Sequence, residues 1–354
     1  MNCYKKSNNE GIRTARVEIS TYMEIFCTGY LCACFRFVFG RRRGFYASVK
    51  KLMVLFLAVI TVMSVAACGG GSSGSGKVYY LNHKDGDGFT DLIKNSFDAK
   101  AKSAGMSVEF RDAKGDGNLQ IDQLKEAIAA KPSAIVLLAV DGTAIIPTVE
   151  KANEAGIPIV ITNRGLAGGK YISSMSDDKE AGRMQGEYMA KNLPQGAKIV
   201  YLEGETGHTG SMARWEGFKE ACLDKRPDVQ LLTRAVANWS TADAIKDMTL
   251  WLKLFPQIDG VVAGNDGMAV GAVQALKDAN RLNGCLVSGV DATADALKLI
   301  QAGEMSQTVK QDAAGQADGL FTLIDSCLKG KVPTENITVP FTSITKENIA
   351  QFAK

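Results

Sequence analysis

Histidine is almost absent from this chain, which has only His83 and His208 among its 354 residues. From residue 77 onward the chain also lacks a Gly-x-Ser-x-Gly motif and any pair of histidines or cysteines at metal-ligand spacing. Serine nucleophiles need a histidine base and zinc sites need such ligand pairs, so both kinds of catalytic site are excluded. We predict a protein that is not an enzyme and that needs no metal or cofactor. One catalytic alternative remains, in which Asp87 and Asp291 act as paired carboxylates on a glycoside.

Proline and net charge are also low. The chain has 8 Pro, 46% hydrophobic residues and a net charge of +3. This composition indicates a globular protein with a sizeable core and excludes disordered and collagen-like chains. The small and evenly spread charge argues against a nucleic acid partner. Beyond residue 67 the chain has Cys222, Cys285 and Cys327 besides Cys68, and three thiols cannot all pair, so we predict no disulfide framework.

A secretion signal is predicted at residues 49–67. Lys50 and Lys51 precede an apolar run at residues 52–62, and small residues then lead to Cys68. This order is typical of a bacterial lipoprotein signal peptide, and the run is short for a membrane span. Cys68 would become the diacylated first residue, which anchors the protein to the cell membrane on the side facing away from the cytoplasm. An ordinary transmembrane anchor is the alternative.

The segments on either side of this signal are predicted from composition. Residues 1–48 have no place before a signal peptide that starts near Val49, and we interpret them as a mistranslated upstream segment. Arg42 and Arg43 faintly resemble a twin-arginine export signal. Residues 68–76 are rich in glycine and serine, which predicts a flexible tether.

Short apolar runs alternate with amphipathic stretches from residue 77 onward, and this predicts an α/β fold with parallel sheets. The expected strands are residues 78–81, 108–111, 134–138, 157–162, 198–202, 229–235, 258–263, 286–290 and 307–310. The expected helices are residues 89–104, 119–130, 179–192, 212–225, 242–254 and 268–279.

The length of this part suits two sheets of five or six strands, and therefore two Rossmann-like lobes with a cleft between them. We expect a three-crossing hinge, with the chain passing between the lobes near residues 175–177, 309–312 and 339–341. The predicted N-terminal lobe is residues 77–175 plus 312–339, and the predicted C-terminal lobe is residues 176–311 plus 340–354.

Polar and aromatic side chains follow nearly every predicted strand. Ligands of open parallel sheets bind beyond the carboxyl ends of the strands. The candidate ligand-binding residues there are Asp87, Phe89, Asn163, Arg164, His208, Arg214, Trp239, Asn265, Asp291 and Gln311. Carboxylates accept hydrogen bonds, arginine donates them and amides do both, while aromatic rings cover an apolar face. This mixture suits a neutral sugar, although each residue taken alone could equally be a helix cap, a turn residue or part of the core.

Five ordered blocks resemble the periplasmic sugar-binding family of the ribose and galactose/glucose receptors. They are NEAGIPIV at 153–160, GETGH at 204–208, ANWSTA at 237–242, GNDGMAVGA at 264–272 and GVDA at 289–292. The resemblance spans the chain from Lys77 onward and implies a type I periplasmic binding protein fold. It implies a monomeric receptor that passes a monosaccharide to an ABC transporter permease, with the ligand-binding roles on the candidate residues above and without a calcium loop.

The resemblance favours a galactose- or glucose-like hexose, with some departures. Gly210 stands where the galactose/glucose branch has a second sugar-binding carboxylate, and Gln311 replaces an asparagine. Arg164 follows Asn163 as in the ribose branch. A pentose or another sugar is therefore one alternative, and a receptor that serves a membrane sensor is another. A transcription regulator on the same fold would need a DNA-binding helix pair where the secretion signal stands.

The lipid anchor gives a direct prediction. Expressed in a bacterial host, the protein should partition into the detergent phase, and Cys68→Ser should move it to the aqueous phase because the acylated residue is lost. Mass spectrometry of the mature N-terminus checks the cleavage point. A mature protein that retains residues 1–48 would contradict both the start site and the anchor.

Overall fold

The computed structural model describes residues 76–352. The predictions for the upstream segment 1–48, the signal peptide 49–67, Cys68 and most of the tether lie outside these residues. Within residues 76–352, no helix has both the length and the hydropathy that crossing a membrane requires.

Two six-stranded sheets form the framework, in the orders β11-β5-β4-β3-β1-β2 and β12-β10-β9-β8-β6-β7. Neighbouring strands run parallel except for β10 and β12. This arrangement confirms the predicted fold class. The first sheet contains β1 (Lys77–Asn82), β2 (Ser107–Asp112), β3 (Ala134–Leu137), β4 (Ile159–Thr162), β5 (Ile172–Met175) and β11 (Ile337–Thr338). The second contains β6 (Lys198–Glu203), β7 (Gln230–Val236), β8 (Gly260–Ala263), β9 (Leu286–Val290), β10 (Gln307–Lys310) and β12 (Thr342–Thr345).

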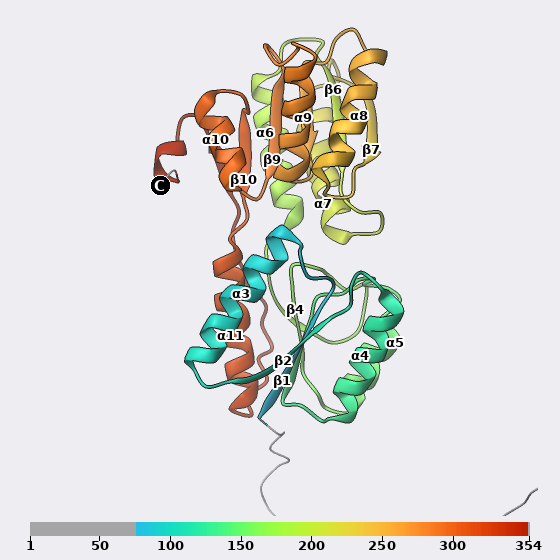
Figure 1. The fold of residues 1–354 in the computed structure, drawn as a ribbon, viewed down its shortest axis with the longest axis vertical. Helices are drawn as coiled ribbons and strands as arrows, with labels where there is room; N and C mark the ends of the chain where they lie inside the picture. Colours follow the sequence, from blue (N-terminus) through green and yellow to red (C-terminus); the bar gives the residue numbers. More distant parts are fainter. Residues whose placement is uncertain (1–75, 353–354) are drawn as a thin grey trace, which may run out of the picture. The chain divides into compact units, whose positions relative to one another are not determined.

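Helices cover both faces of each sheet (Figure 1). The first lobe has α3 (Gly88–Ser103) beside α11 (Ala313–Leu328), and α4 (Gly117–Ala129) beside α5 (Ile146–Glu154). The second lobe has α6 (Asp178–Asn192), α7 (Thr209–Phe218), α8 (Thr241–Leu254), α9 (Asp266–Asp278) and α10 (Ala294–Ala302). A π-helical turn, Lys219–Leu223, extends α7, and a 3₁₀ turn, Ile349–Gln351, follows β12.

Each sheet separates two apolar cores because successive strand residues point to opposite faces. In β1, Val78 and Tyr80 belong to the cluster under α3 and α11, whereas Tyr79 and Leu81 belong to the cluster under α4 and α5. Strands buried on both faces need apolar residues at every position, which explains the continuous apolar runs in the sequence.

The chain passes between the two sheets three times. It leaves the first sheet between Met175 and Asp178, returns between Lys310 and Ala313, and leaves again between Thr338 and Thr342. The precise residue limits of each lobe stay a prediction.

Several elements differ from the sequence expectation. β5, β12, α5, α10 and α11 were not predicted as separate elements. β5 has the sequence ISSM, and its serines are paired within the fold: the Ser174 hydroxyl donates to the Gln316 carbonyl at 2.8 Å. Such a strand has no apolar run to mark it. α7 begins at Thr209 rather than near residue 212, because His208 caps it.

Helices α6 and α7 approach so closely that one contact point admits only glycine. A Cβ atom on Gly182 would lie 1.9 Å from the Arg214 carbonyl oxygen. That distance is far below van der Waals contact, and the obstacle is backbone rather than a movable side chain.

Gly182→Ala should therefore lower the free energy of unfolding by about 1–3 kcal/mol, the usual cost of overpacking. The matched control is Gly117→Ala at the start of α4, where the added Cβ would meet only the Asp141 Cβ, at 4.0 Å. Urea denaturation measures both. Equal stability of the two variants would contradict the close helix packing.

Candidate ligand-binding site

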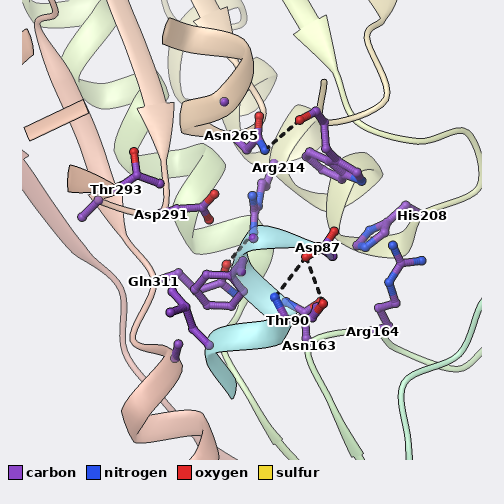
Figure 2. A pocket seen from close by; sticks show the side chains of 17 residues that line it. Asp87, Thr90, Asn163, Arg164, His208, Arg214, Asn265, Asp291, Thr293 and Gln311 are labelled. Atoms are coloured by element: carbon purple, nitrogen blue, oxygen red, sulfur yellow. Dashed lines mark hydrogen bonds between the residues drawn. The ribbon is translucent and has the colours of Figure 1, made fainter. Parts of the chain in front are cut away.

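One cavity of about 330 Å³ is lined by all ten candidate residues that the sequence indicated. Figure 2 shows Asp87, Asn163 and Arg164 on one side, facing His208, Arg214 and Asp291 on the other. The lining also includes residues that the sequence did not single out: Gly88, Thr90, Leu92, Gly267, Ala292, Thr293 and Ala313. That the ten residues share a cavity is a finding, whereas their roles in ligand binding stay a prediction.

The carboxyl ends of parallel strands bring these residues together. Asn163 and Arg164 follow β4, Trp239 follows β7 and Asp291 follows β9. Three others cap helices that start at the cavity, namely Asp87 on α3, His208 on α7 and Asn265 on α9. The first lobe contributes α3 and the β4 loop, and the second lobe contributes the rest of this set.

Unusual backbone conformations gather at this cavity. Asn163, Trp239, Asp291 and Ala292 have φ of 61°, 60°, 126° and 61°. Positive φ is costly for residues other than glycine, and it persists only where the surroundings determine the conformation. The concentration of such residues in the lining marks a site whose side chains are held in fixed directions.

Asp87 uses one carboxylate oxygen for the fold. Its Oδ1 accepts hydrogen bonds from Thr90 N at 3.0 Å and Thr90 Oγ1 at 2.9 Å. Its Oδ2 lies 3.7 Å from His83 Nε2. Burial raises the pKa of Asp87, but His83 and the Thr90 hydrogen bonds outweigh it and lower the pKa below its usual range. Asp87 is therefore an ionised acceptor at the cavity.

His208 is fixed in one tautomer by its capping role. Its Nδ1 accepts hydrogen bonds from Gly210 N at 3.0 Å and Ser211 N at 3.3 Å, so the proton lies on Nε2. Burial and the charges of Arg164 and Arg214 lower the pKa of His208 well below its usual value. The ring is neutral at physiological pH, and its Nε2–H is a donor.

Arg214 is buried with a partner for each part of its guanidinium group. Nε donates to Asp178 Oδ1 at 2.8 Å, Nη1 to the Gly264 carbonyl at 2.6 Å, and Nη2 to Gln311 Oε1 at 3.1 Å. Burial lowers the pKa of Arg214, but the carboxylates of Asp178 and Asp291 raise it overall. The charge is thus retained and compensated within the protein.

Arg164 takes its charge partner from the other lobe. Its Nη2 donates to Glu205 Oε2 at 2.9 Å, and its side chain is only 8% exposed. Its Nη1 makes a long contact of 3.5 Å with the Ala139 carbonyl. Its buried Nε has no hydrogen-bond partner among residues 76–352.

A buried carboxyl group supports the turn that carries Asp291. Asp266 Oδ2 accepts from Thr293 N at 2.7 Å, and Oδ1 accepts from the Thr308 hydroxyl at 2.7 Å. Burial raises the pKa of Asp266 to about 7, against the opposing effect of these hydrogen bonds. Burial also raises the pKa of Asp291, although Arg214 opposes this shift.

The Trp239 ring packs against Gly204 and Gly264. A Cβ atom on Gly204 would lie 2.0 Å from Trp239 Cζ2, and one on Gly264 would lie 3.0 Å from Cζ3. The His208 ring stands edge-on to the indole, with centroids 5.1 Å apart. Any larger residue at position 204 would displace the indole from the cavity.

Sequence reasoning missed the residues that support the lining: His83, Asp178, Glu205 and Asp266. Glu205 and Asp266 lie inside the blocks GETGH and GNDGMAVGA, next to residues that were singled out. Their position was therefore a signal, but their partners are visible only in the folded chain.

Comparison with known proteins bears on this geometry. Residues 78–332 match the model of the periplasmic binding protein domain. A putative rhizopine-binding protein of Rhizobium meliloti is 32% identical, over 75% of this chain and 89% of its own length. A xylitol-binding protein of Mycolicibacterium smegmatis is 31% identical, over 85% of this chain and 87% of its own length. An ABC transporter solute-binding protein of Bacillus halodurans, solved with bound myo-inositol, is 30% identical with a TM-score of 0.75, over 80% of this chain and 99% of that one.

The raised pKa of Asp266 predicts a pH dependence of stability. Between its unfolded value of 3.8 and its folded value of about 7, the folded state holds a proton that the unfolded state has released. This contribution is complete at low pH and is lost as the pH rises through about 7. From pH 5 to pH 8, the wild type should lose roughly 1–3 kcal/mol of unfolding free energy relative to Asp266→Asn. Parallel pH profiles from urea unfolding would contradict the raised pKa.

Proposed function

Because the chain belongs to the family of periplasmic binding proteins, we propose that it captures a neutral, six-membered polyhydroxylated ring and delivers it to an ABC importer. A hexopyranose such as galactose or glucose is one member of this ligand class, and a cyclitol such as myo-inositol is another. The observation that carries the proposal is the set of donors and acceptors that remain unpaired at the cavity.

Several polar groups of the lining are free to bind a ligand. Among the hydrogen bonds of the described residues, none uses Asp291 Oδ1 or Oδ2, His208 Nε2 or the side-chain amide of Asn163. They offer acceptors, a donor and a group that is both. A hydroxyl group both donates and accepts, so a ring with several hydroxyls matches this set better than a ligand with one kind of polar atom.

The charge arrangement favours a neutral ligand. Arg164 is paired with Glu205, and Arg214 is paired with Asp178. Neither guanidinium group therefore presents an uncompensated charge to an anion. Asp87 is ionised, but one of its oxygens already accepts two hydrogen bonds.

The aromatic residues supply the apolar contact that a ring needs. Phe89 lines the cavity from the first lobe and Trp239 from the second. A sugar or cyclitol ring has C–H faces that can pack on such rings, while its hydroxyls point to the polar groups around its edge. An indole covers a broad area, which supports a six-membered ring over a pentofuranose.

The relatives support a neutral polyol as the ligand, and they support the importer. Their names include xylitol, rhizopine and bound myo-inositol, all outside the aldose sugars that the sequence blocks suggested, and one is an ABC transporter protein. The proposal therefore includes cyclitols beside hexoses. Anchoring through Cys68 and delivery from outside the cytoplasm are parts of the same proposal.

A thermal-shift panel tests the ligand class. D-galactose, D-glucose or myo-inositol should raise Tm, because only the folded protein binds the ring. D-glucuronate and D-ribose should raise Tm less. The proposal is wrong if no neutral six-membered polyol shifts Tm while an acidic compound or a disaccharide does.

Trp239→Ala should weaken the binding of the best panel compound more than tenfold, since the variant loses a large apolar contact. Trp239→Phe is the control and should retain most of the affinity because a ring remains. Isothermal titration calorimetry measures both variants. Equal affinities of Trp239→Ala and the wild type would show that the Trp239 ring does not contribute to binding.

A further inference from the structure

Glu205 lies in the loop between β6 and α7 and contacts Arg164, which lines the cavity. Its Oε2 accepts from Arg164 Nη2 at 2.9 Å, and its Oε1 lies 3.5 Å from Lys84 Nζ. Arg164 follows β4 and Lys84 follows β1, so both cations belong to the first lobe while Glu205 belongs to the second. Within the described part of the chain, these are the only ion pairs that join the two lobes.

Arg164 depends on Glu205 for its orientation. The side chain is almost fully buried, its Nε has no partner among the described residues, and its contact with the Ala139 carbonyl is 3.5 Å long. The Glu205 carboxylate is therefore its strongest partner. Burial raises the pKa of Glu205, but the hydrogen bond from Arg164 lowers it overall, so the carboxylate is ionised.

Glu205 also contacts the second lobe's part of the cavity. Its carbonyl accepts a hydrogen bond from His208 N at 3.2 Å, and His208 in turn caps α7. The two lobes are close beside this ion pair, since a Cβ atom on Gly165 would lie 3.2 Å from Thr209 Oγ1. One residue thus links a cavity residue of each lobe at the point where the lobes meet.

We propose that Glu205 is a positioning residue that holds Arg164 against the cavity only while the lobes are closed, and so couples ligand affinity to closure. The proposal rests on the proposed function for the identity of the ligand. Opening the lobes separates Glu205 from both cations, so the ion pairs favour the closed state alone. Glu205 raises affinity without itself lining the cavity.

The test compares Glu205→Gln with Glu203→Gln in the full-length protein, purified in a mild detergent. Glu203 is a matched control because it lies two residues away and pairs with Arg234 within the second lobe, at 3.3 Å. Calorimetry uses whichever of D-galactose, D-glucose and myo-inositol gives the largest Tm shift. Glu205→Gln should weaken binding about 5- to 30-fold, a usual range for a coupling of this kind, and Glu203→Gln should change it less than twofold.

A double-mutant cycle shows whether Glu205 acts through Arg164. Arg164→Ala combined with Glu205→Gln should bind no more than twofold more weakly than Arg164→Ala alone, because Glu205 then has no Arg164 to position and its remaining pair, with the exposed Lys84 at 3.5 Å, contributes little. The proposal would be overturned if the double variant lost affinity by the product of the two single-variant factors, or if Glu205→Gln bound the ligand as tightly as the wild type. The Tm of each ligand-free variant shows that it is folded.

Hydrogen exchange of the ligand-free protein tests the link without any ligand. In Glu205→Gln, amides of residues 163–168 and 204–212 should exchange faster than in Glu203→Gln, because the closed state is less populated. Unchanged exchange in both segments would contradict the proposal. If none of the three panel compounds binds, hydrogen exchange still tests whether Glu205 favours the closed state. The failure of all three compounds to bind would count against the proposed function alone.

Discussion

The buried guanidinium group of Arg214 is the interaction on which the cavity and the hinge depend. Its partners Asp178 and Gln311 lie in the first and second segments that pass between the sheets, and Phe341, in the third, has its ring centroid 5.9 Å from the guanidinium carbon. Its Nη1 also holds the Gly264 carbonyl, at the loop that carries Asn265. Removing one partner of such a buried ion pair typically costs about 3–5 kcal/mol. The position of the hinge segments and the position of the lining are therefore determined by the same side chain.

Charge compensation gives the cavity its chemical character. Both arginines of the lining are paired with carboxylates that stand outside it, Arg164 with Glu205 and Arg214 with Asp178. The charge of both guanidinium groups is thus compensated, and the cavity presents directional hydrogen bonds. Under the proposed function, such a site distinguishes ligands by the arrangement of hydroxyls rather than by charge. Specificity in that proposal rests on the fixed backbone at Asn163, Trp239 and Asp291, where positive φ sets the direction of each side chain.

The sequence predicted two sheets and ten of the residues that line the cavity, because strand ends follow directly from the order of apolar runs. It could not predict the supporting residues, since their partners are set by tertiary structure: Asp178 and Arg214 are 36 residues apart, and Arg164 and Glu205 are 41 apart. It also missed β5, whose Ser174 hydroxyl bonds within the core, and α11, whose Gly319 allows close packing on Ser174. In β5 a tertiary contact, rather than periodicity, determines the local structure, whereas α11 carries buried apolar residues at three- and four-residue spacing that the sequence does display.

The proposed function requires a neutral ring to bind between the two lobes. A crystal structure of the protein grown with myo-inositol or D-galactose tests it most directly. We expect the ring between Phe89 and Trp239, with its hydroxyls within hydrogen-bond distance of Asp291, His208 Nε2 and Asn163. A ligand bound to one lobe alone, or located outside this cavity, would contradict it.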